Sequence, residues 1–281
     1  MNAPRLNLTT RIVTHAILIA LTIVVLFPII WIIFASLKKQ EDLFDSILMP
    51  RGGLSSLTLD NFRTLLTARP FFGWMLNSVF IASTQTILTV LLGTLGGFAL
   101  AKYRFTCKPL IMGVMFATML LPGQVLLPSS YELMRALGWI DSFFGIIVPG
   151  AVSVFGMFLF MQSIKNVPDE LLDAARIDGA SEFYIWWEIV MPTIRPMVGA
   201  YTLMSFLGAW NSFLWPQIVL QDERKYTLPI GLANMLGTSE YLTNYGVLMA
   251  GTLLAVLPVV ALFFLLQREF ISGLTSGALK G

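Results

Sequence analysis

The sequence contains little charge for its length, and long stretches of it contain none. Only 12% of its 281 residues are Asp, Glu, Lys or Arg, whereas 56% are hydrophobic. Soluble globular domains are on average about 25% charged. The composition therefore excludes an ordinary soluble domain and predicts an integral membrane protein.

Residues that support common enzyme chemistries are also scarce. Cys107 is the only cysteine, so an internal disulfide is excluded. The sequence has no GxxxxGK[ST], CxxC, HExxH or GxSxG motif, and we expect neither catalytic nor metal-binding residues in this chain. His15, the only histidine, lies near the start of the first apolar run and is interpreted as a packed or interfacial residue.

Six runs without a charged residue are each 23 to 32 residues long. About 20 apolar residues cross a bilayer as a helix, so the sequence predicts an all-α membrane protein with six spans in a single domain, residues 1–281. The predicted spans are residues 12–37, 73–101, 109–131, 142–164, 196–217 and 245–267. Pro122 and Pro128 predict a bent or broken third span, and the GxxxG at Gly93 and Gly97 favours close helix packing.

The six predicted spans lack Asp, Glu, Lys and Arg altogether. Ion-coupled carriers usually keep an ionisable residue within the membrane. If this protein moves a solute uphill, the energy must therefore come from another subunit. With residues 165–195 inside, Lys and Arg number ten inside and eight outside, and five of those eight lie in one loop, residues 38–69. This count favours cytoplasmic N- and C-termini.

One charged, helix-forming segment stands between two apolar spans. Residues 165–195 contain nine charged residues out of 31. Pro168 suits a first helical turn, and Gly179 can take the positive φ of a sharp turn. Ser181 then predicts the start of a second helix, residues 183–190. The sequence thus predicts a helix–turn–helix elbow in water, either a docking surface for a soluble partner or an ordinary amphipathic interfacial helix.

Residues 170–192 of this elbow resemble the cytoplasmic EAA loop of ABC importer permeases. The motif E-A-A-x-x-x-G stands here as DAARIDG, residues 173–179, followed by Met191 and Pro192. Asp173 replaces the usual Glu, and Met191 replaces the usual Leu. The small side chains of Ala174 and Ala175 would let a partner approach the backbone closely. The residues that the resemblance assigns to ATPase coupling are Glu170, Asp173, Ala174, Ala175, Asp178, Gly179 and Ala180.

Three further segments are similar to the carbohydrate-uptake branch of these permeases, the maltose, arabinose and lactose type. They are WNSFLWP at residues 210–216, TLPIGL at 227–232 and GLTSGALKG at 273–281. The resemblance implies the type I ABC importer permease fold, with six spans and a cytoplasmic coupling helix, in a bacterial inner membrane. It also implies a second permease, two ATPase copies that use ATP and Mg, and an extracytoplasmic solute-binding protein. No cofactor is expected on this chain itself.

A sugar pathway needs hydrogen-bonding side chains and aromatic faces rather than charges. Candidates within the spans are Asn77, Ser83, Gln85, Gln124, Trp210 and Asn211. Such residues more often bridge helices, and Trp often anchors at the membrane interface. The alternatives that stay open are a permease for a polyol or glycerol phosphodiester, a self-sufficient carrier or channel, and a non-transporting anchor.

Overall fold

The computed structural model describes residues 8–50, 52–237 and 244–278, and these residues form helices and turns without any strand. They divide into two compact units. Unit 1 comprises the described residues of Met1–Phe71 and Leu232–Val256, and unit 2 comprises those of Phe72–Gly231 and Leu257–Gly281. The candidate site residues all belong to unit 2.

Unit 1 begins with α1 (Leu8–Leu37), followed by two 3-10 turns, Gln40–Asp42 and Gly53–Ser56, and by α2 (Asp60–Ala68). The amide of Asn61 donates to the backbone oxygens of Ser36 and Lys38 and so closes the end of α1. The Lys38 side chain is buried, and its Nζ donates to the backbone oxygen of Ser46 at 2.6 Å. Lys38 is therefore a structural cation within its own loop.

Unit 2 is built on α3 (Phe71–Lys102), which runs without a break. Its GxxxG packs against α7 (Val154–Lys165), as the sequence predicts. A Cβ at Gly97 would lie 2.9 Å from the backbone nitrogen of Met161, and one at Gly93 would lie 3.1 Å from the Phe160 ring. The backbone contact at Gly97 in particular requires glycine for the two helices to approach so closely.

The third predicted span is broken, as its prolines predict. It consists of α4 (Lys108–Met119), a 3-10 turn (Gly123–Leu126) and α5 (Leu127–Ala136), and the two halves are bent by 93°. The fourth divides into α6 (Phe144–Gly150) and α7. Pro122, at the bend, lacks the N–H that a continuous helix would need.

The last two spans differ from their predicted bounds. The fifth, predicted at 196–217, is α11 (Arg195–Trp210), a break, and α12 (Leu214–Val219). After a 3-10 turn (Glu223–Lys225) and α13 (Leu228–Gly237), α14 runs from Tyr245 to Ala278, eleven residues beyond its predicted end. Four described stretches are long and apolar enough to cross a membrane, or five if the bent pair counts as one. The total of six spans stays a prediction.

Candidate functional site

The elbow, residues 165–195, begins where α7 ends. Its first helix is α8 (Asp169–Ile177), preceded by Pro168 and carrying Asp169 and Glu170 in its first turn. Acidic residues there complement the positive end of the helix dipole. Leu172 turns inward and is only 1% exposed. The local sequence thus sets where α8 starts, and one leucine sets which face of the helix is buried.

The turn after α8 uses the conformation that only glycine adopts freely. Gly179 has a φ of +82°, and its N–H donates to the Arg176 oxygen, while the Ala180 N–H donates to the Ala175 oxygen. The Ser181 hydroxyl then accepts from the Tyr184 N–H and starts the next helix. The positive φ predicted for Gly179 and the helix start predicted at Ser181 are confirmed.

The second helix of the elbow is not the single α-helix predicted for residues 183–190. It consists of α9 (Glu182–Tyr184), a π-helical turn (Ile185–Val190) and α10 (Met191–Thr193). The wider turn accompanies the burial of Ile185, Trp186 and Val190. The second helix therefore departs from the α-helix that residues 183–190 predicted.

The buried face of the elbow belongs to the main core of unit 2. Leu172, Ile185, Trp186 and Val190 share one cluster with Phe98, Phe160, Ile164, Val167, Ile194 and Tyr201. Ala175 and Ala180 are half-buried and pack against the same cluster. Ala175 thus faces the core of this chain, whereas it was expected to leave room for a partner. The elbow is anchored to the spans by apolar packing rather than suspended from flexible loops.

The opposite face of α8 is exposed. Glu170, Asp173, Ala174 and Ile177 lie at i, i+3, i+4 and i+7, which places them along one side of the helix. Ile177 is 86% exposed. The sequence did not predict that Ile177 is exposed. Its position on the helix, roughly opposite the buried Leu172, could have indicated this.

Charged side chains fix the internal geometry of the elbow. Arg176 pairs with Asp173 and with Glu182, each at 2.8 Å, and so links α8 to α9. Glu182 also accepts the Tyr103 hydroxyl. The hydrogen bonds from Arg176, followed by that from Tyr103, lower the pKa of Glu182. Asp173 is therefore already paired within the chain.

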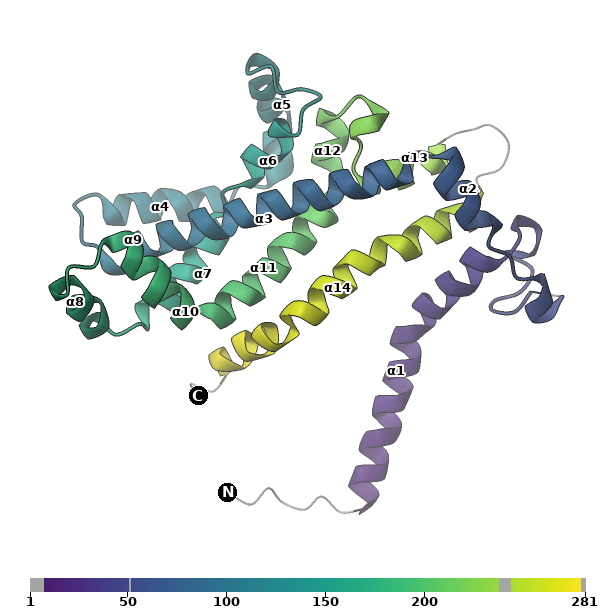
Figure 1. Cartoon of the computed structure of the whole chain (residues 1–281), viewed down its shortest axis with the longest axis horizontal. Coiled ribbons are helices and arrows are strands. Elements are labelled where there is room, and N and C mark those ends of the chain that lie inside the picture. The colour runs from purple at the N-terminus through teal and green to yellow at the C-terminus, as the bar shows by residue number, and fades with distance from the viewer. Residues whose placement is uncertain (1–7, 51, 238–243, 279–281) are drawn as a thin grey trace. The chain divides into compact units, whose positions relative to one another are not determined.

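A second tie joins the elbow to the end of α3. Lys102 Nζ lies 2.6 Å from Asp169 Oδ1 and also donates to the Val167 backbone oxygen. The hydrogen bond and the positive charge of Lys102 lower the pKa of Asp169. The Lys102 side chain is largely buried while that of Asp169 is exposed. Figure 1 shows α8 and α9 at this end of α3.

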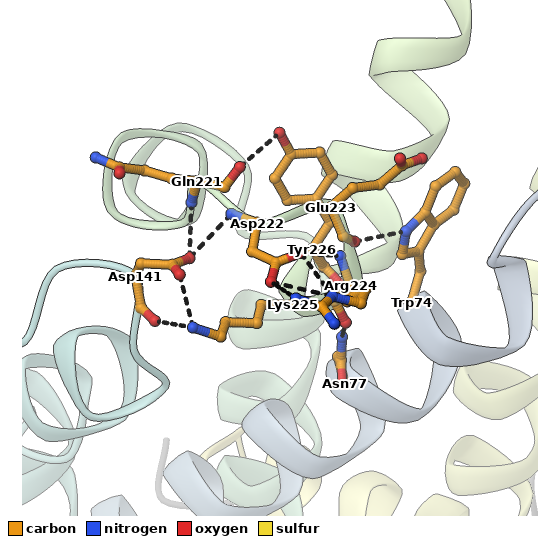
Figure 2. A network of polar contacts seen from close by, with 9 residues as sticks. All are labelled: Trp74, Asn77, Asp141, Gln221, Asp222, Glu223, Arg224, Lys225 and Tyr226. Carbon is orange, nitrogen blue, oxygen red and sulfur yellow. Dashed lines mark hydrogen bonds and ion pairs between the residues drawn. The ribbon is translucent and has the colours of Figure 1, made fainter.

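The other end of α3 holds a polar loop, residues 221–226 (Figure 2). Trp74 Nε1 donates to the Glu223 oxygen at 3.1 Å, and the Asn77 amide donates to the oxygens of Arg224 and Tyr226. Asn77, a candidate pathway residue, therefore has its amide N–H groups committed to the backbone of this loop.

Asp141 holds the same loop from a second side (Figure 2). It is a non-glycine residue at positive φ, +54°. Its carboxylate accepts the N–H groups of Gln221 and Asp222 and lies 2.6 Å from Lys225 Nζ. Burial opposes ionisation, but these three hydrogen bonds outweigh it and lower the pKa of Asp141 to about 2.

The remaining pathway candidates are not brought together. Trp210 is buried and stacks on Phe206, with ring centroids 5.7 Å apart. The Asn211 amide donates to the Leu207 oxygen, and Gln124 lies exposed at the bend of the third span. Gln85, in contrast, lines a cavity of about 280 Å³. Ser130, Ser212 and Trp215 line the same cavity, and the sequence did not predict these three as pathway residues. Among the described residues no cluster of three His, Cys, Asp or Glu could hold a metal ion.

Known proteins resemble this chain over nearly its whole length. The arabinooligosaccharides transport system permease protein AraQ of Bacillus subtilis is 36% identical over 272 residues, 96% of each chain. The sn-glycerol-3-phosphate transport system permease protein UgpE of Salmonella choleraesuis is 32% identical, covering 94% of this chain and 95% of the relative.

A solved structure and a family model support the same assignment as these relatives. A chain of a bacterial ABC transporter involved in the import of the acidic polysaccharide alginate has the same fold, with a TM-score of 0.82 at 22% identity, covering 95% of this chain and all of the other. Residues 89–275 match the family described as binding-protein-dependent transport system inner membrane component. The chain therefore belongs to this family of ABC importer permeases.

Proposed function

We propose that this chain is the permease subunit of an ABC importer for a sugar, that it forms half of the translocation pore, and that a separate ATPase drives it through the elbow. The ATPase dimer would bind ATP and Mg, and its closure would displace α8 and tilt the spans between inward- and outward-facing states. In this proposal the chain itself performs no hydrolysis.

The observation that carries the coupling role is the construction of the elbow. Its inner face is packed into the core of unit 2, and Lys102 and Arg176 brace it with ion pairs. Its outer face presents Glu170, Ala174 and Ile177 to solvent. A helix that is rigidly attached on one side and open on the other is suited to receive a force from a partner and pass it to the spans. The residues proposed to meet the ATPase are Glu170, Asp173, Ala174, Asp178 and Gly179, with Ala175 and Ala180 supporting them from within.

The proposed orientation follows from the elbow and the charge count. An ATPase that uses cellular ATP must lie in the cytoplasm, so residues 165–195 and both termini would be cytoplasmic. The loop held by Asp141, Trp74 and Asn77 would then lie outside, where a solute-binding protein docks. Residues 1–7 and 279–281, including the end of the GLTSGALKG segment, lie outside the described residues.

The solute is proposed to be a sugar because AraQ, whose name states arabinooligosaccharide transport, is 36% identical to this chain over 96% of its length. A second candidate is a glycerol phosphate, favoured by the match to UgpE at 32% identity. In both cases a second, different permease would complete the pore.

The test is a gentle detergent purification of the chain from its native membrane, with co-purifying subunits identified and counted by mass spectrometry. We expect two ATPase copies and one further permease. Recovery of this chain alone, or only with copies of itself, would overturn the importer assignment. Uptake of labelled arabinotriose and of labelled sn-glycerol-3-phosphate by the purified complex in liposomes, with its binding protein, then separates the two solutes.

A further inference from the structure

Unit 2 contains an open cavity of about 280 Å³ lined by residues of α3, α5, α6 and α12 and by Ser212 just before α12. Its lining residues are Gln85, Leu127, Ser130, Ile146, Pro149, Gly150, Ser212 and Trp215. Figure 1 shows α5, α6 and α12 together on one side of α3. The breaks in the third, fourth and fifth predicted spans lie beside this space, because α5 and α12 begin, and α6 ends, at such a break.

Three polar side chains of the cavity are uncommitted among the described residues. In the part of the chain that the structure describes, the Gln85 amide and the hydroxyls of Ser130 and Ser212 make no hydrogen bond. Together they offer two amide donors, an amide acceptor and two hydroxyls that both donate and accept. All three residues are half-buried and line the cavity, so their polar groups are available to water or to a ligand.

The wall of the cavity is shaped around Gln85. A Cβ at position 150 would lie 2.4 Å from the Gln85 amide, so Gly150 leaves the space that this amide occupies. Trp215 donates its Nε1–H to the Gly145 oxygen at 2.9 Å, which fixes the indole in the wall. A rigid aromatic ring beside uncommitted amide and hydroxyl groups is the usual lining of a small-molecule site.

Size and charge narrow the ligand class. At about 30 Å³ per water molecule in the liquid, the volume of about 280 Å³ corresponds to about nine water molecules, which is room for one sugar ring. None of the lining side chains is charged. A phosphate or carboxylate would call for Arg or Lys at hydrogen-bonding distance. We propose that the cavity is a subsite for one ring of a neutral sugar, so that this chain contacts the solute directly; this rests on the proposed sugar import.

Cysteine protection tests the subsite without relying on transport. Cys107 is the only cysteine and is exposed, so Cys107→Ser gives a cysteine-free background. Ser130→Cys is introduced there, and its reaction with a maleimide is followed in the assembled importer. The matched control is Ser129→Cys, an exposed neighbour on α5 that does not line the cavity.

We expect millimolar arabinotriose to slow labelling of the Ser130→Cys variant at least threefold, and sn-glycerol-3-phosphate to have no effect. Labelling of the Ser129→Cys variant should be unchanged by both. Equal rates with and without arabinotriose at position 130, or equal protection by the phosphate, would overturn the proposal.

A kinetic test follows from the same residues. Gln85→Leu keeps the size of the side chain but removes its hydrogen bonds, and we expect the KM for arabinotriose uptake to rise about tenfold. Gln217→Leu makes the same change at an exposed position of α12 outside the cavity and should leave the KM unaltered. Basal ATPase activity and subunit content show whether each variant assembles. An unchanged KM in an assembled Gln85→Leu complex would contradict the subsite.

The two proposals fail in different ways. If the wild-type complex takes up arabinotriose but the variants at Gln85 and Ser130 behave like their controls, sugar import stands and the subsite is wrong. If wild type does not take up arabinotriose while the Ser130→Cys variant is still protected by it, the cavity binds a neutral sugar and the proposed import is wrong.

Discussion

Replacing Ile177 with Ser should weaken ATPase binding while leaving this chain folded. The Ile177 side chain is 86% exposed, so its removal takes little from the core. Exposed substitutions usually change stability by less than about 0.5 kcal/mol. If a cleft of the ATPase covers this side chain, the burial is worth about 1.5–3 kcal/mol. A loss of about 2 kcal/mol corresponds to an approximately 30-fold higher Kd.

The assay is a titration of the purified ATPase against the permease pair in detergent, with Kd read from fluorescence anisotropy of a labelled ATPase. Leu54→Ser is the matched control, because Leu54 is also a largely exposed hydrophobic residue but lies in the loop after α1. Its Kd should equal that of wild type. Leu172→Ala is the opposite control. Since Leu172 is 1% exposed, we expect about 2–5 kcal/mol of lost stability there, visible as a lower Tm.

A Kd within twofold of wild type for the Ile177→Ser complex would refute the reasoning that α8 docks by its exposed face. Weaker binding together with a lowered Tm of this chain would refute the claim that Ile177 is free of the core. Only the combination of an unchanged Tm and a raised Kd supports the arrangement.

Three further predictions concern the ties around the site. Gly179→Ala should lower the stability of the turn by about 1–2 kcal/mol, because the positive φ disfavours alanine although no atom lies within 4 Å of the new Cβ. Gly179→Pro also removes the N–H that donates to the Arg176 oxygen. ATP-driven uptake should therefore fall partly for the Ala variant and wholly for the Pro variant. Because the pKa of Asp141 is lowered, the contribution of Asp141 to stability is present above about pH 4 and is lost as the pH falls toward 2. Amide hydrogen exchange of residues 221–226 should therefore become faster at low pH, and in the Asp141→Asn variant it should already be fast at pH 7. Lys102→Met should increase hydrogen exchange in α8 more than Asp169→Asn does, because Lys102 is buried and also binds the Val167 oxygen.

The parts of the site that could be predicted from the sequence depend on neighbouring residues. The start of α8 after Pro168, the positive φ of Gly179 and the cap by Ser181 each involve groups within four residues. Such signals are local, and a single sequence contains them. The bend at Pro122 was predictable for the same reason, since proline removes its own N–H whatever surrounds it.

The parts that could not be predicted depend on distant residues. Asn77 was a candidate for the pathway because it is polar within an apolar run, yet its partners are backbone oxygens 147 and 149 positions away. Ala175 was expected to face a partner, but the core cluster that it meets is assembled from α3, α7 and α11. Periodicity identifies the two sides of a helix, but which side is covered depends on the rest of the fold.

The cavity could not be predicted from the sequence for the same reason. Gln85 was a candidate for its residue type alone, and so were Asn77 and Asn211, whose amides are satisfied by backbone oxygens. Residue type cannot separate a structural amide from an uncommitted one. Ser130 and Ser212 were not among the pathway candidates, although Ser212 lies in the WNSFLWP segment, and both line the cavity next to a break in a span.

Helix α3 connects the three features on which function is proposed to depend. Asn77 holds the polar loop, Gln85 lines the cavity and Lys102 holds the elbow. At about 1.5 Å per residue, Asn77 and Lys102 lie roughly 38 Å apart along the axis, more than the approximately 30 Å of the hydrocarbon layer. Both anchored ends can therefore reach water on opposite sides of a membrane. Because α3 contains no proline or break between them, we expect a displacement of the elbow that moves Lys102 to pass along α3 as a tilt of the whole helix. Such a tilt would move Gln85 relative to α5, α6 and α12, and so would change the cavity and the polar loop together.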